Sequence, residues 1–292
     1  MQAIYRTINF INNHPLTKKN LILAYYRFFK WQLNSILNKN LQSVNFIGPI
    51  NFLAKKRLTG ITGNIYTGLH EFNDMGFLLH LLKQGDVFFD VGANVGSYTL
   101  LASYRKAKTI AFEPIPETFD ILTKNIQLNS LQSDVTLVNK AVSSRYGILN
   151  FTNNQDTTNH VVRHSGEQTT EVEMILLDDF FAEHKPILMK VDVEGFETEV
   201  LNGSQSYLSD TSLKAIIIEL NGSGNRYGFK DDDIHAKLLK HHFKPYDYNP
   251  FNRILKELNT YGKDNTIYVR DIEFIKKRIQ LSEPFNILNQ VI

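Results

Sequence analysis

Apolar runs and amphipathic stretches alternate along the chain from residue 86 onward. The first run, "DVFFDV", is a short apolar block bounded by glycines, which is typical of a buried strand. Further strands are predicted at 108–113, 135–142, 187–193, 214–220 and 265–270. Helices are predicted at about 95–105, 116–129, 196–207 and 231–241. This alternation favours an α/β fold, in which helical crossovers join the strands of a mostly parallel sheet.

The polar interval from 146 to 178 interrupts this alternation. It reads as a turn-rich insertion flanked by two β-like segments at about 148–152 and 170–176. The α/β pattern itself begins near residue 65. We therefore divide the chain into an N-terminal helical extension, residues 1–64, and one α/β domain, residues 65–292.

The first 70 residues carry nine Lys or Arg and no acidic residue, whereas the rest holds the other 23 basic and all 30 acidic residues. Within this segment, "LAYYRFFKWQLNSIL" has apolar residues at roughly helical spacing. One interpretation is a helix that packs on the α/β domain and turns a basic face to solvent. The other is contact with an anionic membrane or acidic substrate through residues 1–45, because basic and aromatic residues together favour acidic headgroups. A nucleic-acid partner is not expected, since this mixture alone is a weak signal.

The composition, 42% hydrophobic and 21% charged, is that of a globular protein with a sizeable core. The chain has no cysteine, which excludes disulfides, cysteine nucleophiles and thiolate metal sites. It shows neither an apolar run long enough to span a membrane nor the apolar region of a secretory signal peptide. We therefore expect a cytoplasmic protein, which is peripheral to a membrane if the basic segment contacts one.

A glycine-containing loop, "DVGANVG" at residues 90–96, follows the first predicted strand. It lacks the Lys and the Ser or Thr of a phosphate loop, and its spacing does not match the dinucleotide fingerprint G-x-G-x-x-G. Glu113 ends the second strand 23 residues after Asp90, near the offset at which an acid binds ribose hydroxyls. Asp90 would repel a diphosphate but suits a cationic group. The loop therefore fits S-adenosylmethionine, which carries a ribose and an ammonium group without phosphate.

Three motifs together resemble the FkbM family of S-adenosylmethionine-dependent methyltransferases: D-x-G-A-N-x-G, "FEPIPETFDILTKNIQLN" and "MKVDVEGFETEVLNG". The resemblance covers about residues 65–270 and implies a class I, Rossmann-like fold with helices on both faces of the sheet, and usually O-methylation. By position it implies that five residues contact the cofactor: Asp90, Gly92, Asn94, Gly96 and Glu113. Four more complete the candidate cofactor-binding set: Glu71, Pro114, Asn139 and Asp192.

The resemblance leaves the acceptor open, because the family is broad in substrate and is linked with glycans and secondary metabolites. We expect a hydroxyl acceptor on a sugar of a surface glycan or glycolipid, with a small secondary metabolite as the alternative. A nicotinamide-dependent oxidoreductase and a non-catalytic cofactor-binding module share parts of the pattern. The oxidoreductase needs a glycine in place of Asn94, and the binding module has no need of polar strand ends.

Polar residues end the fourth and fifth predicted strands, where the ligands of open parallel sheets bind. Asp192 and Glu194 are candidate catalytic residues, and Lys190 shares their face if the strand continues to that point. Asp192, Glu219 and Asn221 resemble the oxygen ligands of magnesium in catechol-type O-methyltransferases. Three residues at strand ends are a loose constraint, so no metal is expected.

Two histidines of the polar insertion, His160 and His164, are further candidates for a general base. His70, just before Glu71, is interpreted as a solvated surface residue. Methyl transfer from a sulfonium is an in-line displacement, so positioning supplies much of the rate. A base would add about 10²–10⁴-fold for a hydroxyl acceptor. The sequence does not choose among Asp192, Glu194 and the insertion histidines for this role.

Overall fold

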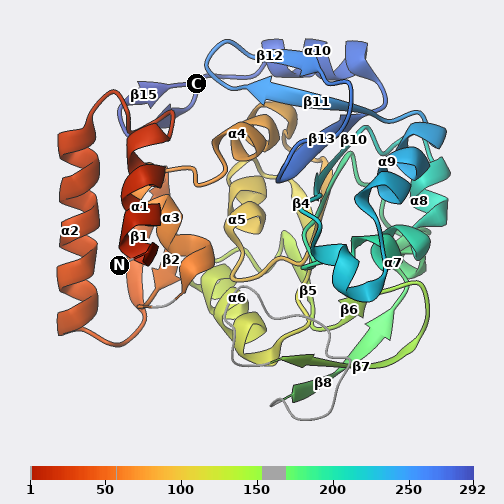
Figure 1. Ribbon diagram of the computed structural model, residues 1–292, viewed down its shortest axis with the longest axis horizontal. Coiled ribbons are helices and arrows are strands. Elements are labelled where there is room, and N and C mark those ends of the chain that lie inside the picture. The colour runs from red at the N-terminus through yellow and green to blue at the C-terminus, as the bar shows by residue number, and fades with distance from the viewer. Residues whose placement is uncertain (1, 57, 153–168) are drawn as a thin grey trace.

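The computed structural model describes residues 2–56, 58–152 and 169–292, and its centre is an eight-stranded sheet (Figure 1). The strands lie in the order β12-β11-β13-β10-β9-β3-β4-β5. Their bounds are Val87–Val91 (β3), Lys108–Phe112 (β4), Val135–Val138 (β5), Leu188–Val191 (β9), Ala215–Glu219 (β10), Lys244–Asn249 (β11), Ile254–Glu257 (β12) and Asn265–Val269 (β13). Strands β5, β4, β3, β9 and β10 are parallel, and β13 pairs antiparallel with both β10 and β11. The predicted Rossmann-like α/β fold is confirmed.

The strand order reverses beside β3. From β3 the chain adds β4 and β5 on one side, and it then returns to add β9 and β10 on the other. In an open parallel sheet, a crevice forms beyond the carboxyl ends of the strands at such a switch point. The residues that follow β3, β4, β9 and β10 therefore meet at one edge of the sheet.

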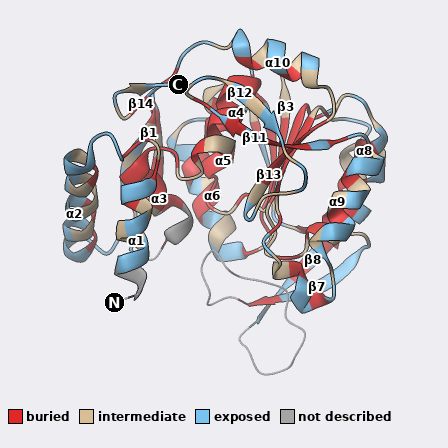
Figure 2. Ribbon diagram, turned by 45° about the horizontal axis from the view of Figure 1, so that its top comes forward, coloured by how far each residue is buried: buried red, intermediate tan, exposed pale blue. Residues whose placement is uncertain are grey.

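Helices cover both faces of this sheet (Figures 1 and 2). Successive strand residues point to opposite faces, so Phe88 joins the core on one side and Phe89 the core on the other. The first core is shared with α4 (Phe72–Leu81), α5 (Ser97–Tyr104), α6 (Pro116–Leu128) and α10 (Ile272–Gln280), and the second with α7 (Glu197–Asn202), α8 (Gln205–Ser209) and α9 (Asp231–Lys240). The helix predicted at 196–207 is divided at Gly203, where a Cβ atom would lie 1.9 Å from the carbonyl oxygen of Ser143.

The N-terminal segment contains a β-hairpin as well as helices. Its elements are α1 (Gln2–Asn13), α2 (Leu21–Leu37), β1 (Gln42–Ile47), β2 (Ile50–Ala54) and α3 (Thr59–Thr67). The hairpin corrects the expectation of a purely helical extension. Ile11, Trp31 and Phe52 share one hydrophobic core with α4 and α5, and a boundary at residue 64 would fall inside α3. The division into an extension and a domain stays a prediction.

Helix α2 packs by one face and exposes a second apolar face (Figure 2). Ala24, Trp31 and Ser35 are buried, and Arg27 donates from Nε and Nη2 to the carbonyl oxygen of Tyr66 at 3.0 and 2.9 Å. Six large apolar side chains, which we call the outer face of α2, are each between 58% and 86% exposed: Ile22, Tyr26, Phe29, Leu33, Ile36 and Leu37. The predicted packing of this helix is confirmed, but the expectation of a solvated basic face is wrong. Among the described helices, none has the combined length and hydropathy of a membrane span.

The interval from 146 to 178 contributes to a small second sheet of order β6-β8-β7. Strands β7 (Gly147–Thr152) and β8 (Thr169–Ile175) confirm the two predicted β-like segments. The single strand predicted at 135–142 is divided, because the chain leaves the main sheet after β5 and pairs β6 (Ala141–Val142) with β8. The remaining elements are 3-10 helices at Leu177–Phe180 and Ser223–Tyr227, and a hairpin of β14 (Asn286–Ile287) and β15 (Gln290–Val291).

Candidate functional site

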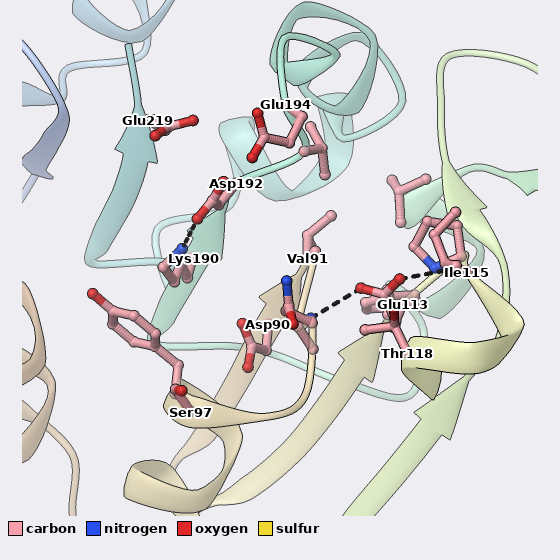
Figure 3. A pocket seen from close by; sticks show the side chains of 18 of the residues that line it. Asp90, Val91, Ser97, Glu113, Ile115, Thr118, Lys190, Asp192, Glu194 and Glu219 are labelled. Carbon is pink, nitrogen blue, oxygen red and sulfur yellow. Dashed lines mark hydrogen bonds and ion pairs between the residues drawn. The ribbon is translucent and has the colours of Figure 1, made fainter. Parts of the chain in front are cut away.

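A cavity lies beyond the carboxyl ends of β3, β4, β9 and β10, at the switch point of the sheet (Figure 3). Figure 3 shows Asp192, Glu194 and Glu219 on one side and Glu113 on the opposite side, with Asp90 between them. Seven of the nine predicted cofactor-binding residues line the cavity: Glu71, Asp90, Gly92, Asn94, Glu113, Pro114 and Asp192. The structure therefore brings together most residues that the sequence singles out, from segments more than 100 residues apart.

The two glycines of the loop after β3 are required by packing. Gly92 has a φ of 83°, and a Cβ atom there would lie 1.8 Å from the carbonyl oxygen of Asp192. Gly96 has a φ of 98°, and its Cβ atom would lie 2.6 Å from Cδ1 of Leu122 in α6. Gly96 does not line the cavity. The close approach that these glycines permit is thus to the loop after β9 and to α6.

Glu113 joins the loops that follow β3 and β4. Its Oε2 accepts a hydrogen bond from the N–H of Asn94, and its Oε1 accepts one from the N–H of Ile115, both at 2.9 Å. Burial raises the pKa of Glu113 to about 7, although these two bonds lower it. Each oxygen keeps a lone pair for another donor, so the side chain could hold ligand hydroxyls. Asn139 lies behind this group, since its Nδ2 donates to the carbonyl oxygens of Glu113 and Pro114 at 2.8 and 3.0 Å.

Asp90 is buried at the base of the cavity, with 1% of its surface exposed. Its Oδ2 accepts a hydrogen bond from Oγ1 of Thr99 at 2.6 Å. Burial raises the pKa of Asp90 to about 6, although the charge of Lys190 and the bond from Thr99 lower it. A buried carboxylate is costly without a cationic partner. This position could therefore hold an ammonium group.

Lys190 is a buried cation among carboxylates, with 3% of its surface exposed. Its Nζ lies 2.6 Å from Oδ2 of Asp192 and 4.7 Å from the centre of the Tyr98 ring. Burial alone would lower the pKa of Lys190, but the carboxylates of Asp192, Glu71 and Asp90 raise it well above its ordinary value. Lys190 therefore stays charged and holds Asp192 in place.

Glu194 and Glu219 extend this acidic side of the cavity (Figure 3). Burial, together with the Asp192 carboxylate, raises the pKa of Glu194 to about 7 and that of Glu219 to about 8. Oε2 of Glu219 is buried and has no hydrogen-bond partner among the described residues. A buried oxygen of this kind is available to a ligand.

The three residues considered as magnesium ligands do not surround one position. Asp192 and Glu219 line the cavity, whereas Asn221 is exposed and its Oδ1 accepts a hydrogen bond from the N–H of Ser223 at 2.8 Å. Oδ2 of Asp192 is already paired with Lys190. Within the described residues, no group of three or more His, Asp or Glu side chains could hold a metal ion.

Comparison with known proteins identifies the family. Residues 90–245, more than half of the chain, match the model of the methyltransferase FkbM domain. The chain belongs to the FkbM methyltransferase family. It is 34% identical over 147 residues to the hexuronic acid methyltransferase AglP of Haloferax volcanii, covering 49% of this chain and 59% of that protein. It is 30% identical over 169 residues to methyltransferase sdnD of Sordaria araneosa, covering 45% and 65%. The chain thus spans less than two thirds of either relative.

Among solved structures, an rRNA methylase from Streptococcus thermophilus is a more remote likeness. The two chains align with a TM-score of 0.41 and 14% identity, over 68% of this chain and 93% of that one.

One histidine of this FkbM methyltransferase, His70, differs from expectation. His70 lines the cavity, so its interpretation as a solvated surface residue is wrong. Its ring packs on Gly63 of α3, where a Cβ atom would lie 2.1 Å from Nδ1, and burial lowers its pKa. The sequence contains a sign of this contact, the glycine at position 63 inside a helix. Only the structure reveals that this glycine contacts the residue seven positions later. His160 and His164 lie between residues 153 and 168, outside the described residues.

Proposed function

We propose that the protein transfers a methyl group from S-adenosylmethionine to a hydroxyl group of a sugar, in a glycan or glycolipid. Membership of the FkbM methyltransferase family supports methyl transfer. The observation that carries the choice of donor is the pair of carboxylates, Asp90 and Glu113, at the ends of adjacent strands in one cavity. Both lysines of its described lining, Lys140 and Lys190, are engaged in ion pairs, which leaves neither free to bind a phosphate.

The cavity residues fit the parts of this donor. S-adenosylmethionine, when bound, supplies a methyl group on a positively charged sulfur. Glu113 holds the ribose hydroxyls through the lone pairs that Asn94 and Ile115 leave free. Asp90 faces the ammonium group, which compensates for the burial of its carboxylate. Asp192 and Glu194 line the part of the cavity formed by the loop after β9.

The choice of a sugar as acceptor is supported by one relative. AglP is by name a hexuronic acid methyltransferase, and a hexuronic acid is a sugar that carries hydroxyl groups. The match spans 59% of AglP, so this support concerns the class of acceptor. A small hydroxylated metabolite is the alternative acceptor.

Calorimetry with S-adenosylmethionine, S-adenosylhomocysteine and NADH tests the donor. The first two should bind and NADH should not. Glu113→Ala should weaken binding by about 1.5–3 kcal/mol, because a hydrogen bond to a charged group is lost. Glu117→Ala is the matched control, since Glu117 is exposed at the start of α6 and does not line the cavity. Unchanged affinity in a folded Glu113→Ala protein would rule out the ribose assignment, and binding of NADH would point to an oxidoreductase.

We also propose that the outer face of α2 contacts an anionic membrane that carries the acceptor. Its six exposed apolar side chains adjoin exposed Lys30 and Lys39, in a segment without acidic residues. Amphipathic helices with aromatic and basic residues bind such surfaces. A second copy of the chain is a poorer partner, because two basic segments would repel each other. One helix of 17 residues, about 25 Å long, also offers less than the roughly 800 Å² per partner of a stable interface.

Sedimentation with phosphatidylglycerol vesicles tests this contact. The unaltered protein should bind in a salt-sensitive way, and Phe29→Ser combined with Leu33→Ser should abolish binding without unfolding the protein. Asn34→Ser, at an exposed neighbouring position of α2, is the control. Deleting residues 1–40 is unsuitable, because Trp31 belongs to the shared core. Equal binding by both variants would mean that the outer face is not the contact surface.

A further inference from the structure

A second, more open cleft of about 1040 Å³ adjoins the cavity of the candidate site. Its lining includes Asn9 and Asn13 of α1, together with residues of β11 and of the start of β13. Three residues line both the cavity and this cleft: His70, Glu71 and Glu219. The two spaces therefore meet at these side chains.

We propose that this second cleft, the acceptor cleft, binds the sugar and that His70 removes the proton from the hydroxyl group that is methylated. The inference rests on the proposed function. It assigns α1 a role in binding the acceptor, and it assigns His70 the role of general base.

The lining of the acceptor cleft suits a sugar. Asn9, Asn13 and Asn265 offer amide donors and acceptors, and Asp247 offers a carboxylate whose Oδ1 already accepts from Nδ2 of Asn73 at 2.9 Å. A sugar hydroxyl both donates and accepts hydrogen bonds, so mixed amides and carboxylates match it. The volume is at the upper end of that of small-molecule pockets, which leaves room for a sugar unit with its neighbours in a chain.

Unpaired buried oxygens lie where the two spaces meet. Oε2 of Glu219 and Oδ1 of Asn265 have no hydrogen-bond partner among the described residues. Glu71 is held there by Asn265, whose Nδ2 donates to its Oε1 at 2.8 Å. Buried polar atoms are normally paired within the protein or by a ligand. The acceptor hydroxyl groups can supply the missing donors at this point.

His70 is placed to act on a hydroxyl group at the same point. Its backbone N–H donates to Oδ1 of Asn64 at 2.7 Å, and its Nδ1 is turned toward Gly63. Nε2 is then the ring nitrogen on the side away from α3. Burial lowers the pKa of His70, so the imidazole is neutral near pH 7 and can accept a proton.

The step balances without another reactant. The acceptor O–H bond breaks, and its proton passes to Nε2 of His70 while the oxygen forms a bond to the methyl carbon. The carbon–sulfur bond breaks at the same time, and its electron pair stays on sulfur, which becomes an uncharged thioether. The imidazolium then releases its proton to water.

The test uses the whole protein, labelled S-adenosylmethionine and carbohydrate extracted from cells that lack the gene. His70→Gln should reduce kcat by about 10²–10⁴-fold. Its Kd for S-adenosylmethionine, measured by calorimetry, and its KM for the carbohydrate should change less than about 3-fold. Gly63→Ala has helical backbone geometry and keeps the histidine, but its Cβ atom would displace the ring, so it should also reduce kcat. If His70→Gln does not fold, Gly63→Ala tests the proposed role of His70 in its place.

The acceptor cleft has a separate test on α1. Asn9→Trp should obstruct the cleft and raise the KM for the carbohydrate more than about 10-fold, with donor affinity unchanged. Asn12→Trp is the control, because Asn12 is exposed on the same helix outside the lining of the cleft. A near-normal kcat in His70→Gln, or an unchanged KM in Asn9→Trp, would overturn this inference and leave the proposed function intact. An unaltered protein that binds the donor but labels no carbohydrate would refute the sugar acceptor and the inference with it.

Discussion

Replacing Gly92 by alanine should destabilise the protein far more than the same replacement at Gly85. The two glycines have almost the same backbone conformation, with φ values of 83° and 86°. They differ in their surroundings. A Cβ atom at Gly92 would lie 1.8 Å from the carbonyl oxygen of Asp192 and 2.8 Å from its carbonyl carbon, whereas nothing lies within 4 Å of a Cβ atom at Gly85. The pair therefore separates a steric effect from a backbone effect.

The expected magnitudes follow from these contacts. An alanine in the left-handed conformation costs about 1–2 kcal/mol at either position. At Gly92 the carbon would also stand roughly 1.5 Å inside the usual carbon–oxygen contact of about 3.3 Å. Both groups are backbone or directly attached to it, so the loops after β3 and β9 must move apart, at a further cost of about 2–3 kcal/mol. We expect Gly92→Ala to lose about 3–5 kcal/mol and Gly85→Ala about 1–2 kcal/mol.

Urea unfolding followed by circular dichroism measures both losses. Calorimetry with S-adenosylmethionine provides a second measurement, because the loop after β3 forms part of the cavity and Gly85 lies at the other end of the strand. Donor binding should weaken in the Gly92 variant and persist in the Gly85 variant. Equal losses of stability in the two variants would show that the contact with Asp192 does not constrain the loop.

Three further predictions concern charge. Burial raises the pKa of Glu113 from 4.5 to about 7, so its contribution to stability is present below pH 4.5 and is lost as pH rises through 7. Between about pH 4 and pH 8, the free energy of unfolding measured in urea should therefore fall about 3 kcal/mol less for Glu113→Gln than for the unaltered protein. Lys190→Met should destabilise the fold by about 3 kcal/mol at pH 8 and less at pH 5, where Asp90 binds a proton, whereas loss of the exposed Lys140–Glu173 pair in Lys140→Met should have little effect on stability. Methyl transfer should survive chelation; a loss that Mg²⁺ restores would show a metal requirement.

Much of the fold could be predicted from the sequence, because buried parallel strands give continuous apolar runs. Strand β10, "AIIIE", is such a run, and four of its five residues are buried. Strands β11 and β12, at one end of the sheet, escaped prediction because "KPYDYN" and "ILKE" mix charged and apolar residues, as half-exposed strands do. Strand β1 of the N-terminal hairpin likewise alternates between exposed and less exposed residues.

The site could be predicted only where its residues follow a strand or share a local motif. Asp90, Glu113 and Asp192 lie within one residue of the carboxyl ends of β3, β4 and β9, so the rule for open sheets places them together. The pairing of Glu71 with Asn265 joins residues 194 positions apart, and no local pattern announces it. His70 shows the same limit, because its burial depends on a helix from the N-terminal segment. From the sequence, this segment is predicted to be separate from the α/β domain, although in the structure it contributes to the lining of the acceptor cleft.

The balance of charge around the cavity gives a physical reason for release of the product in the proposed reaction. Asp192, Glu194 and Glu219 stand on one side, and Lys190 is the cation that faces them among the described lining residues. Burial keeps the pKa values of Glu194 and Glu219 near 7 and 8, so these carboxyls ionise more readily when a further positive charge is present. A sulfonium donor brings that charge, and its thioether product does not. The acidic wall therefore favours the donor over the product, which helps the product to leave after the methyl group has moved to the acceptor.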